Sequence, residues 1–319
     1  MNYIGIDISK ASFDVAFPTA KAYKLKKYTN NAAGFAKLLD HLEDDCCCVM
    51  EATGPYYMRL ATFLHEQQIA VAVVNPLVIK RFSQMRLLRA KTDQADAKLI
   101  ASYGQCQQPG LWTPPLWFIS ELQQESTVLE GLIKQRTALK NQQEAFGALP
   151  HVSQQALDSL DELLKALNEQ IKLLEKSMAR KTKAHGNQQL ECLTSIPGIG
   201  QKTAIHLFII TQGFTRFETS KQLSAYIGIS PRIYESGTSV KGRPKISKLG
   251  MSRFRAILYM CTWSAVKYNK ACREFYERLL AKGKAKNLAL IAVANKLVKQ
   301  AFAIATKKQI YNELIPALA

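Results

Sequence analysis

YIGID, at residues Tyr3–Asp7, and CCCVME, at residues Cys46–Glu51, are apolar stretches that each end in an acidic residue. A strand that is apolar almost to its last residue is buried on both faces of a sheet. The acid that ends it then emerges at the sheet edge, where open α/β folds place their ligands. The two stretches therefore predict two strands that bring Asp7 and Glu51 to one site.

The surrounding sequence predicts an α/β domain over residues 1–110. Further strands are predicted at Ser12–Phe17 and Ala70–Val74, and helical spacing of apolar residues is found at 31–42 and 57–67. Such an alternation of short strands and helices predicts a central sheet with at least one parallel pair.

Two more acids, Asp93 and Asp96, lie in KTDQADAKLI at residues 91–100, which is typical of a helix start. Their spacing of three puts both carboxylates on one helical face, about 5 to 6 Å apart at Cβ. A purely structural role is the alternative, with Asp93 capping the helix and Asp96 facing its dipole.

Together the four acids have the layout of an RNase-H/RuvC-like divalent-metal site. Mg²⁺, or Mn²⁺ in its place, is a hard ion that is bound by a few carboxylates together with phosphate oxygens. Two such ions can stabilise both the attacking and the leaving oxygen of a phosphoryl transfer. The acids therefore predict an enzyme that acts on phosphodiesters.

The charge distribution predicts a polyanionic partner. The chain has 319 residues, enough for two domains or more, and a formal net charge of +18. Residues 230–319 hold 18 Lys or Arg against 4 Asp or Glu, so most of the surplus belongs to the C-terminal part. A charge block of this kind usually faces a nucleic acid, although a solvated surface is the alternative.

The sequence favours a cytosolic protein. Met1 leads directly into a strand without a signal-like segment, and no run of about 18 apolar residues occurs. The seven cysteines include no CxxC pair and no zinc-like spacing with His. They are interpreted as small buried hydrophobic residues in a reducing compartment.

Residues 111–185 are predicted to be a helical hairpin or coiled-coil linker. Leucines recur near heptad spacing on both sides of the break GALP at residues 147–150. A single hairpin has little of its own chain to cover this leucine stripe, so we expect it to pair with another protomer. Packing against the chain's own domains is the alternative.

Residues 186–319 are predicted to form a mainly helical domain that opens with SIPGIGQKTA at residues 195–204. This has the form of a helix-hairpin-helix, in which glycines allow a tight turn and backbone N–H groups bind a phosphate. A loop rich in Ser, Gly and cations follows at residues 228–250. The candidate nucleic-acid contacts are Gly198, Gly200, Lys202, Arg232, Lys241, Arg243, Lys245, Lys248, Arg253 and Arg255.

Almost the whole chain resembles the DEDD-type insertion-sequence transposases, which include pilin-gene invertases and bridge-RNA-guided recombinases. The resemblance is carried by YIGIDISK, MEATGPY, NPLVIKRF, KTDQADAKLIA, SIPGIG and YESGTSVKGRPKISKLG. It implies a RuvC-like domain whose four acids are Asp7, Glu51, Asp93 and Asp96. It also implies a C-terminal transposase domain whose serine nucleophile is Ser236. Ser239 lies three residues further on, and motif position favours Ser236.

The resemblance also implies a function. The protein would be an enzyme that cuts and rejoins DNA through a phosphoserine link, with Mg²⁺ or Mn²⁺ at the acids. A structured noncoding (bridge) RNA would choose the DNA sites. Dimers and tetramers would act on element ends and target DNA in the bacterial cytosol, with acids and serine from the same or different protomers. The alternatives are a RuvC-like structure-specific nuclease that uses water as its nucleophile, and a DNA-binding protein without catalysis.

Overall fold

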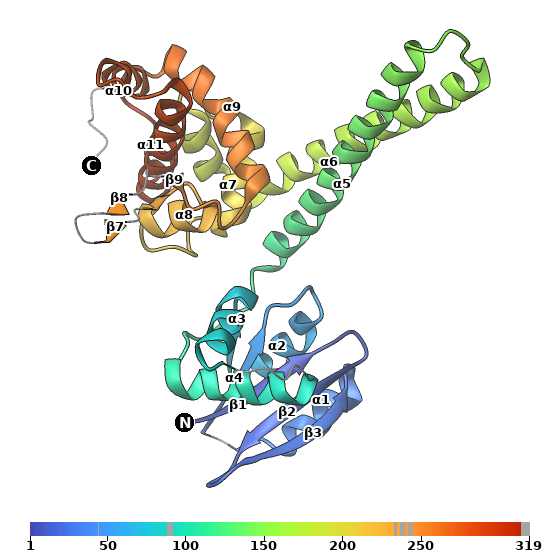
Figure 1. Cartoon of the computed structure of the whole chain (residues 1–319), viewed down its shortest axis with the longest axis vertical. Coiled ribbons are helices and arrows are strands. Elements are labelled where there is room, and N and C mark those ends of the chain that lie inside the picture. Colours follow the sequence, from blue (N-terminus) through green and yellow to red (C-terminus); the bar gives the residue numbers. More distant parts are fainter. Residues whose placement is uncertain (44, 88–91, 233–234, 237–239, 242–244, 314–319) are drawn as a thin grey trace. The chain divides into compact units, whose positions relative to one another are not determined.

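The computed structural model of the chain describes residues 1–43, 45–87, 92–232, 235–236, 240–241 and 245–313 (Figure 1). At 235–236 and 240–241 it describes the backbone only. The chain divides into two compact units, Met1–Pro114 and Pro115–Ala319. Residues 108–116, which contain the division, have no helix or strand.

The first unit is built on a five-stranded sheet with the order β3-β2-β1-β4-β5. The central strand β1 runs parallel to β4 and antiparallel to β2, and β4 runs parallel to β5. This confirms the predicted mixed α/β fold with parallel pairs. The strands are β1 (Asn2–Ile8), β2 (Ser12–Pro18), β3 (Tyr23–Thr29), β4 (Cys46–Glu51) and β5 (Ala70–Val74).

Helices cover both faces of this sheet. On one face, the even-numbered β1 residues Ile4 and Ile6 share a core with α1 and α2. On the other face, Cys47 and Val49 of β4 share a core with α3 and α4. The helices are α1 (Ala32–Leu39), α2 (Tyr57–Glu66), α3 (Pro76–Met85) and α4 (Asp93–Gln107).

A glycine allows α4 to lie directly on β1. A Cβ atom added to Gly5 would come within 2.0 Å of the Ala97 carbonyl oxygen and 2.3 Å of the Ala101 nitrogen. Only a residue without a side chain permits this approach. Gly5 therefore sets the position of α4, whose first turn carries Asp93 and Asp96.

The second unit begins with a helical hairpin formed by α5 (Trp117–Gly147) and α6 (Gln154–Thr194). The leucine stripe that the sequence predicts to face another protomer is largely covered within the chain, because α5 packs along α6 and leaves Leu160, Leu164 and Ile171 buried. Leu163 and Leu173 remain 53% and 60% exposed. The stripe is thus no argument for self-association.

The remainder of the second unit is mainly helical, as predicted. It packs with the base of the hairpin around one apolar core, to which α11 contributes Val293, Leu297 and Val298. By length and composition alone α11 could cross a membrane, but half of its most apolar stretch is buried inside the protein. The helices are α7 (Gln201–Thr211), α8 (Ser220–Ile227), α9 (Ser252–Tyr268), α10 (Lys270–Ala281) and α11 (Lys286–Lys307).

The Ser-Gly-rich segment between α8 and α9 is not a plain loop. It contains two short antiparallel ladders, in which β6 pairs with β9 and β7 pairs with β8. These strands are β6 (Pro231–Arg232), β7 (Glu235–Ser236), β8 (Val240–Lys241) and β9 (Lys245–Ile246).

Candidate active site and nucleic-acid interface

The ends of β1 and β4 place Asp7 and Glu51 next to each other. The two strands pair in parallel with Ile6 opposite Met50, so the next position in this register sets Asp7 beside Glu51. Residues in register on parallel strands point to the same face, and neighbouring strands lie about 4.8 Å apart. Because side chains alternate along a strand, Asp7 shares its face with Gly5, on which α4 lies.

A third carboxylate, Asp14, extends this row. It lies directly opposite Asp7 in the antiparallel β1–β2 pair, and Lys27 of β3 lies opposite Asp14 in turn. Asp14 is only 5% exposed, and its carboxylate is 3.4 Å from the Lys27 Nζ. We did not predict Asp14 as part of the site, although an acid inside the apolar strand SFDVAFP was a usable signal.

Asp93 and Asp96 lie in the first turn of α4, on the same side of the sheet. Asp93 is exposed and Asp96 is half-buried. The helix is capped by Thr92, whose hydroxyl accepts a hydrogen bond from the Ala95 N–H at 3.1 Å. The alternative role of Asp93 as the helix cap is therefore wrong.

The electrostatics of Asp7 show that the four predicted acids lie near one another. Burial and, to smaller extents and in this order, the negative charges of Asp96, Asp93, Glu51 and Asp14 together raise the pKa of Asp7 from 3.8 to about 6. A half-buried carboxylate among like charges is costly to ionise. A cation bound here would relieve this cost.

The carboxylate oxygens at the carboxyl ends of β1 and β4 fit a divalent metal ion, because Mg²⁺ prefers carboxylate oxygens. Among the residues that the structure describes, however, no three Asp, Glu, His or Cys side chains are close enough together to hold one ion. Binding would thus draw the side chains of Asp7, Glu51 and Asp96 closer to one another.

Thr53 fixes the orientation of Glu51. Its hydroxyl donates a hydrogen bond of 2.5 Å to Glu51 Oε1, and its backbone N–H donates to the Glu51 carbonyl at 2.8 Å. The turn that follows uses a positive φ of 62° at Gly54, which suits glycine. Thr53 was not predicted, although it follows Glu51 by only two residues in the motif MEATGPY.

In the second unit, the SIPGIG segment makes the turn between α6 and α7. Gly198 has a φ of +106°, and a Cβ there would lie 2.7 Å from that of Ala265 on α9. Gly200 is the N-cap residue of α7, where no side chain caps the helix, and a Cβ added to it would meet nothing within 4 Å. Lys202 Nζ lies 2.6 Å from Glu175 Oε1 on α6. The assignment of this turn as a helix-hairpin-helix stays a prediction.

The predicted nucleophile belongs to a short ladder near α8 and α9. Ser236 of β7 pairs with Val240 of β8, while its side chain lies outside the described atoms. Ser239 and Arg243 lie outside the described residues altogether, and the backbone of Lys241 lies in β8.

The other predicted phosphate contacts fall into two groups. Arg232, Lys245 and Lys248 are exposed. The two arginines at the start of α9 already have partners in the protein. Arg255 donates to the Ile227 carbonyl at 2.9 Å, and Arg253 lies 3.4 Å from Glu130 on α5.

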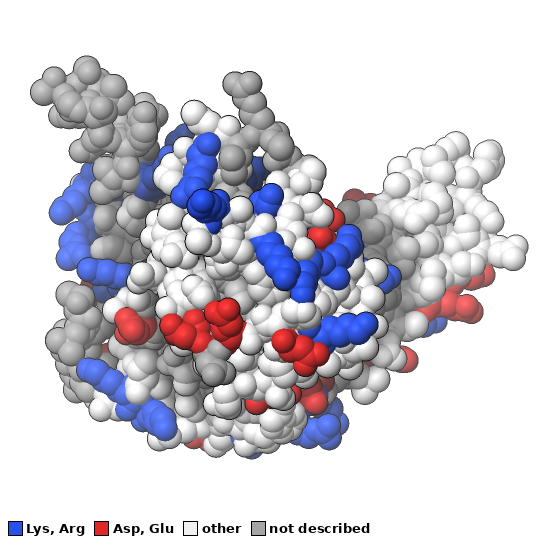
Figure 2. Space-filling view, turned by 90° about the horizontal axis from the view of Figure 1, so that it is seen from below, with Lys and Arg blue, Asp and Glu red and all other residues white. Residues whose placement is uncertain are grey.

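The positive charge is divided unequally between the two units. Residues 1–114 carry 13 Lys or Arg and 10 Asp or Glu, while residues 115–319 carry 30 and 15. The net charges are thus +3 and +15. In the view of Figure 2 the basic side chains do not form a single patch, and acidic side chains lie between them. Acids near one another at the ends of β1 and β4, together with a strongly basic helical unit, are typical of an enzyme that acts on nucleic-acid strands.

Comparison with known proteins specifies the family. A family model described as Transposase, for DEDD transposases of IS110 elements, matches residues 4–149. A second, described as Transposase IS116/IS110/IS902 family, matches residues 190–277. The chain is 30% identical over 328 residues to the pilin gene-inverting protein of Moraxella lacunata, with 98% of each chain covered.

It is also 25% identical over 297 residues to the transposase for insertion sequence element IS1111A of Coxiella burnetii, covering 83% of this chain and 79% of that one. The chain belongs to the IS110 family of DEDD transposases and is a DNA transposase or recombinase.

Proposed function

We propose that the protein recombines DNA through a covalent link to Ser236, with divalent metal ions held by Asp7, Glu51, Asp93 and Asp96. In this reaction the Ser236 oxygen attacks a DNA phosphorus and forms a phosphoserine ester. The bond from phosphorus to the leaving sugar oxygen breaks, and that oxygen leaves as a hydroxyl after taking up a proton. Attack by a hydroxyl of another DNA strand reverses these steps and reseals the DNA without ATP.

The observation that carries this proposal is the convergence of charge on Asp7, whose pKa responds to the three other predicted acids. Bound Mg²⁺ or Mn²⁺ would stabilise the attacking and leaving oxygens of the phosphoryl transfer. Thr53 would keep Glu51 oriented toward the site, and Gly5 would keep the first turn of α4 above it. Asp14 would add negative charge without an exposed carboxylate.

The basic second unit supports binding of long polyanions through their phosphates. We propose element-end and target DNA as partners, and a structured guide RNA whose base pairing selects the sites. Self-association to dimers and tetramers rests on the family resemblance, since α5 covers most of the leucine stripe.

The test is a Mg²⁺-dependent strand-transfer assay on DNA that spans the ends of the element encoding the protein, with and without the transcript of its flanking sequence. Denaturing gels would detect a protein–DNA adduct. We expect an adduct and joined products with the wild type, and neither with Ser236→Ala. Asp7→Asn should also abolish both while leaving DNA binding intact.

Ser239→Ala is the matched control, because it removes the neighbouring hydroxyl of the same segment. It should keep the adduct if Ser236 is the nucleophile. Cleavage by Ser236→Ala without an adduct would overturn the proposal and indicate a two-metal nuclease. Binding without chemistry in every variant, including the wild type, would indicate a protein that only binds DNA. Equal recombination with and without the transcript would exclude the guide RNA.

A further inference from the structure

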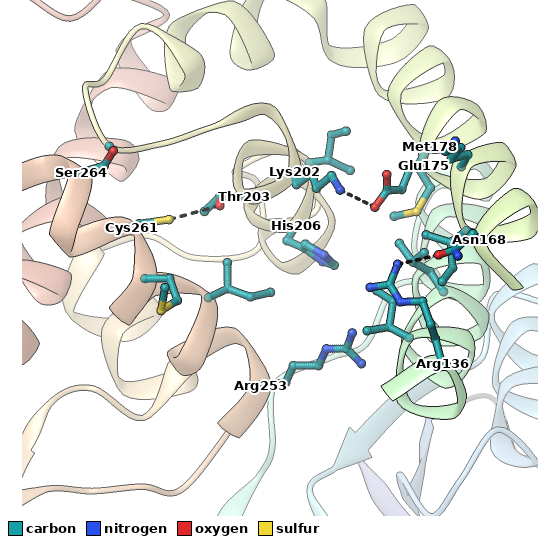
Figure 3. A pocket seen from close by; sticks show the side chains of 18 residues that line it. Arg136, Asn168, Glu175, Met178, Lys202, Thr203, His206, Arg253, Cys261 and Ser264 are labelled. Carbon is teal, nitrogen blue, oxygen red and sulfur yellow. Dashed lines mark hydrogen bonds and ion pairs between the residues drawn. The ribbon is translucent and has the colours of Figure 1, made fainter. Parts of the chain in front are cut away.

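A groove of about 700 Å³ lies in the second unit, between the hairpin and helices α7 and α9 (Figure 3). It is lined on one side by residues of α5 and α6, and on the other by residues of α7 and α9. Its volume is that of a small-molecule site. An occupant of this size is one or a few nucleotides rather than a whole duplex.

The groove is rich in cations, which come from both sides. Lys202 of α7 and Arg253 of α9 lie across the groove from Arg136 of α5 (Figure 3), and Lys172 of α6 also lines it. His206 of α7 also lines the groove, but burial lowers its pKa, Glu130 raises it and Arg253 lowers it, so the positive charge comes from the lysines and arginines rather than from His206. The groove therefore favours a bound negative charge.

Two carboxylates of the hairpin form ion pairs with cations on the opposite side of the groove. Glu175 of α6 lies 2.6 Å from Lys202, and Glu130 of α5 lies 3.4 Å from Arg253. Each pair joins a cation on α7 or α9 to an anion on the hairpin. The side chain of Lys202 is 75% exposed, and ion pairs this exposed contribute little to stability. Exchange of Glu175 for a phosphate oxygen is thus inexpensive, whereas Arg253 and Glu130 are only 31% and 36% exposed.

The rest of the lining suits a nucleotide base. Ile205, Ile257 and Met260 give the groove an apolar wall. Trp263 does not line the groove, but it lies one turn beyond Met260 on α9 and is 56% exposed. Single-strand-binding proteins combine such a cationic groove with aromatic side chains on which bases stack.

We propose that this groove binds single-stranded DNA, whose phosphates replace Glu175 and Glu130 as partners of Lys202 and Arg253. DNA is favoured over RNA because the chain belongs to a family of DNA transposases. The inference rests on this action on DNA, and it does not depend on Ser236 as the nucleophile.

The first test compares two substitutions that each remove one ion-paired carboxylate from the hairpin. Glu175→Gln frees a cation of the groove, whereas Glu121→Gln removes one of the two carboxylates paired with Lys181, which lies outside the groove lining. Binding of a fluorescent single-stranded oligodeoxynucleotide would be measured by anisotropy. We expect Glu175→Gln to bind about fivefold more tightly than the wild type, the equivalent of one exposed ion pair. Glu121→Gln should bind as the wild type does.

The second test measures the salt dependence of the same binding. Lys172 lines the groove, and Lys165 lies two turns away on the same helix outside it. Loss of one phosphate contact on a single strand makes the slope of log K against log salt shallower by about 0.7. We expect this change for Lys172→Gln and no change for Lys165→Gln.

Equal affinities for Glu175→Gln and Glu121→Gln, or equal slopes for the two lysine variants, would overturn the proposal. So would equal or tighter binding of a duplex or of single-stranded RNA with the same sequence. Circular dichroism would verify the fold, and Glu130→Gln would replace Glu175→Gln if that variant does not fold. Strand-transfer assays with Ser236→Ala test the proposed function separately, because that variant keeps the groove intact.

Discussion

Thr53 holds the Glu51 carboxylate through one short hydrogen bond, and this bond can be removed without touching an acid. Thr53→Val keeps the shape of the side chain and removes its hydroxyl. Because residues that orient metal ligands typically affect metal affinity by about 10- to 100-fold, we expect Mn²⁺ to bind about tenfold more weakly. Isothermal titration calorimetry would measure this. Thr53→Ser, which keeps the hydroxyl, should bind like the wild type, and equal weakening of both variants would contradict the role of the hydrogen bond.

The raised pKa of Asp7 predicts how stability without metal depends on pH. The pKa of Asp7 rises from 3.8 to about 6 on folding, so the folded state binds its proton more tightly than the unfolded chain does. Stability from this group is present below pH 3.8 and is lost as the pH rises through about 6. Thermal unfolding in EDTA should therefore show a smaller decline over this window for Asp7→Asn than for the wild type. Identical pH profiles would contradict the assignment.

Individual site residues were predictable from sequence only where a local feature, such as an apolar strand, determines their position. Asp7 is the next-to-last residue of β1 and Glu51 is the last residue of β4, so their meeting followed from the parallel pairing of those strands. The part played by Asp14 depends on the register between β1 and β2, which residue types do not determine. The contact between Lys202 and Glu175 joins residues 27 apart, and it depends on how α7 packs against α6.

At the scale of elements, Gly5 connects the position of a helix to the geometry of the site. Gly5→Ala would place a methyl group 2.0 Å from the Ala97 carbonyl oxygen, so α4 must move away from β1. Such overpacking costs about 1 to 3 kcal/mol. Because α4 carries Asp93 and Asp96, we expect weaker Mn²⁺ binding as well as lower stability, measured by calorimetry and thermal unfolding.

The control for this change is Gly110→Ala in the same unit, since an added Cβ there meets nothing within 4 Å. It should leave both metal binding and stability close to those of the wild type. If Gly5→Ala lost stability but kept full metal affinity, the position of α4 would not control the site.

The elements themselves were predictable to different degrees. The apolar strands β1, β4 and β5 were recognised because burial on both faces leaves an uninterrupted apolar run. The edge strand β3 was missed, since its sequence YKLKKYT contains three lysines, which have low strand propensity but commonly protect exposed sheet edges. The covering of most of the leucine stripe by α5 did not follow from sequence, because heptad spacing does not tell whether the covering helix belongs to the same chain; pairing with another protomer stays a prediction.

At the scale of the whole molecule, the two units have separate apolar cores, so we expect them to unfold in two calorimetric transitions. Two glycine substitutions can assign them. Gly5→Ala should lower only the transition of the first unit. Gly186→Ala should lower only the other, because a Cβ at the kink of α6 would lie 2.2 Å from the Phe208 ring. For the second unit, a loss of 1 kcal/mol in stability corresponds to a fall of about 2 to 4 °C in the midpoint of its transition.

The shift of these transitions on addition of Mg²⁺ would show which unit of the intact chain holds the metal site. A ligand that binds only the folded form stabilises the unit that holds it. Mg²⁺ should therefore raise the transition that Gly5→Ala lowers, and Asp7→Asn should remove this shift. The basic second unit, with a net charge of +15, should instead be stabilised by DNA. A Mg²⁺ shift confined to the transition that Gly186→Ala lowers would place the metal site in the second unit and contradict its assignment to the four acids of the first.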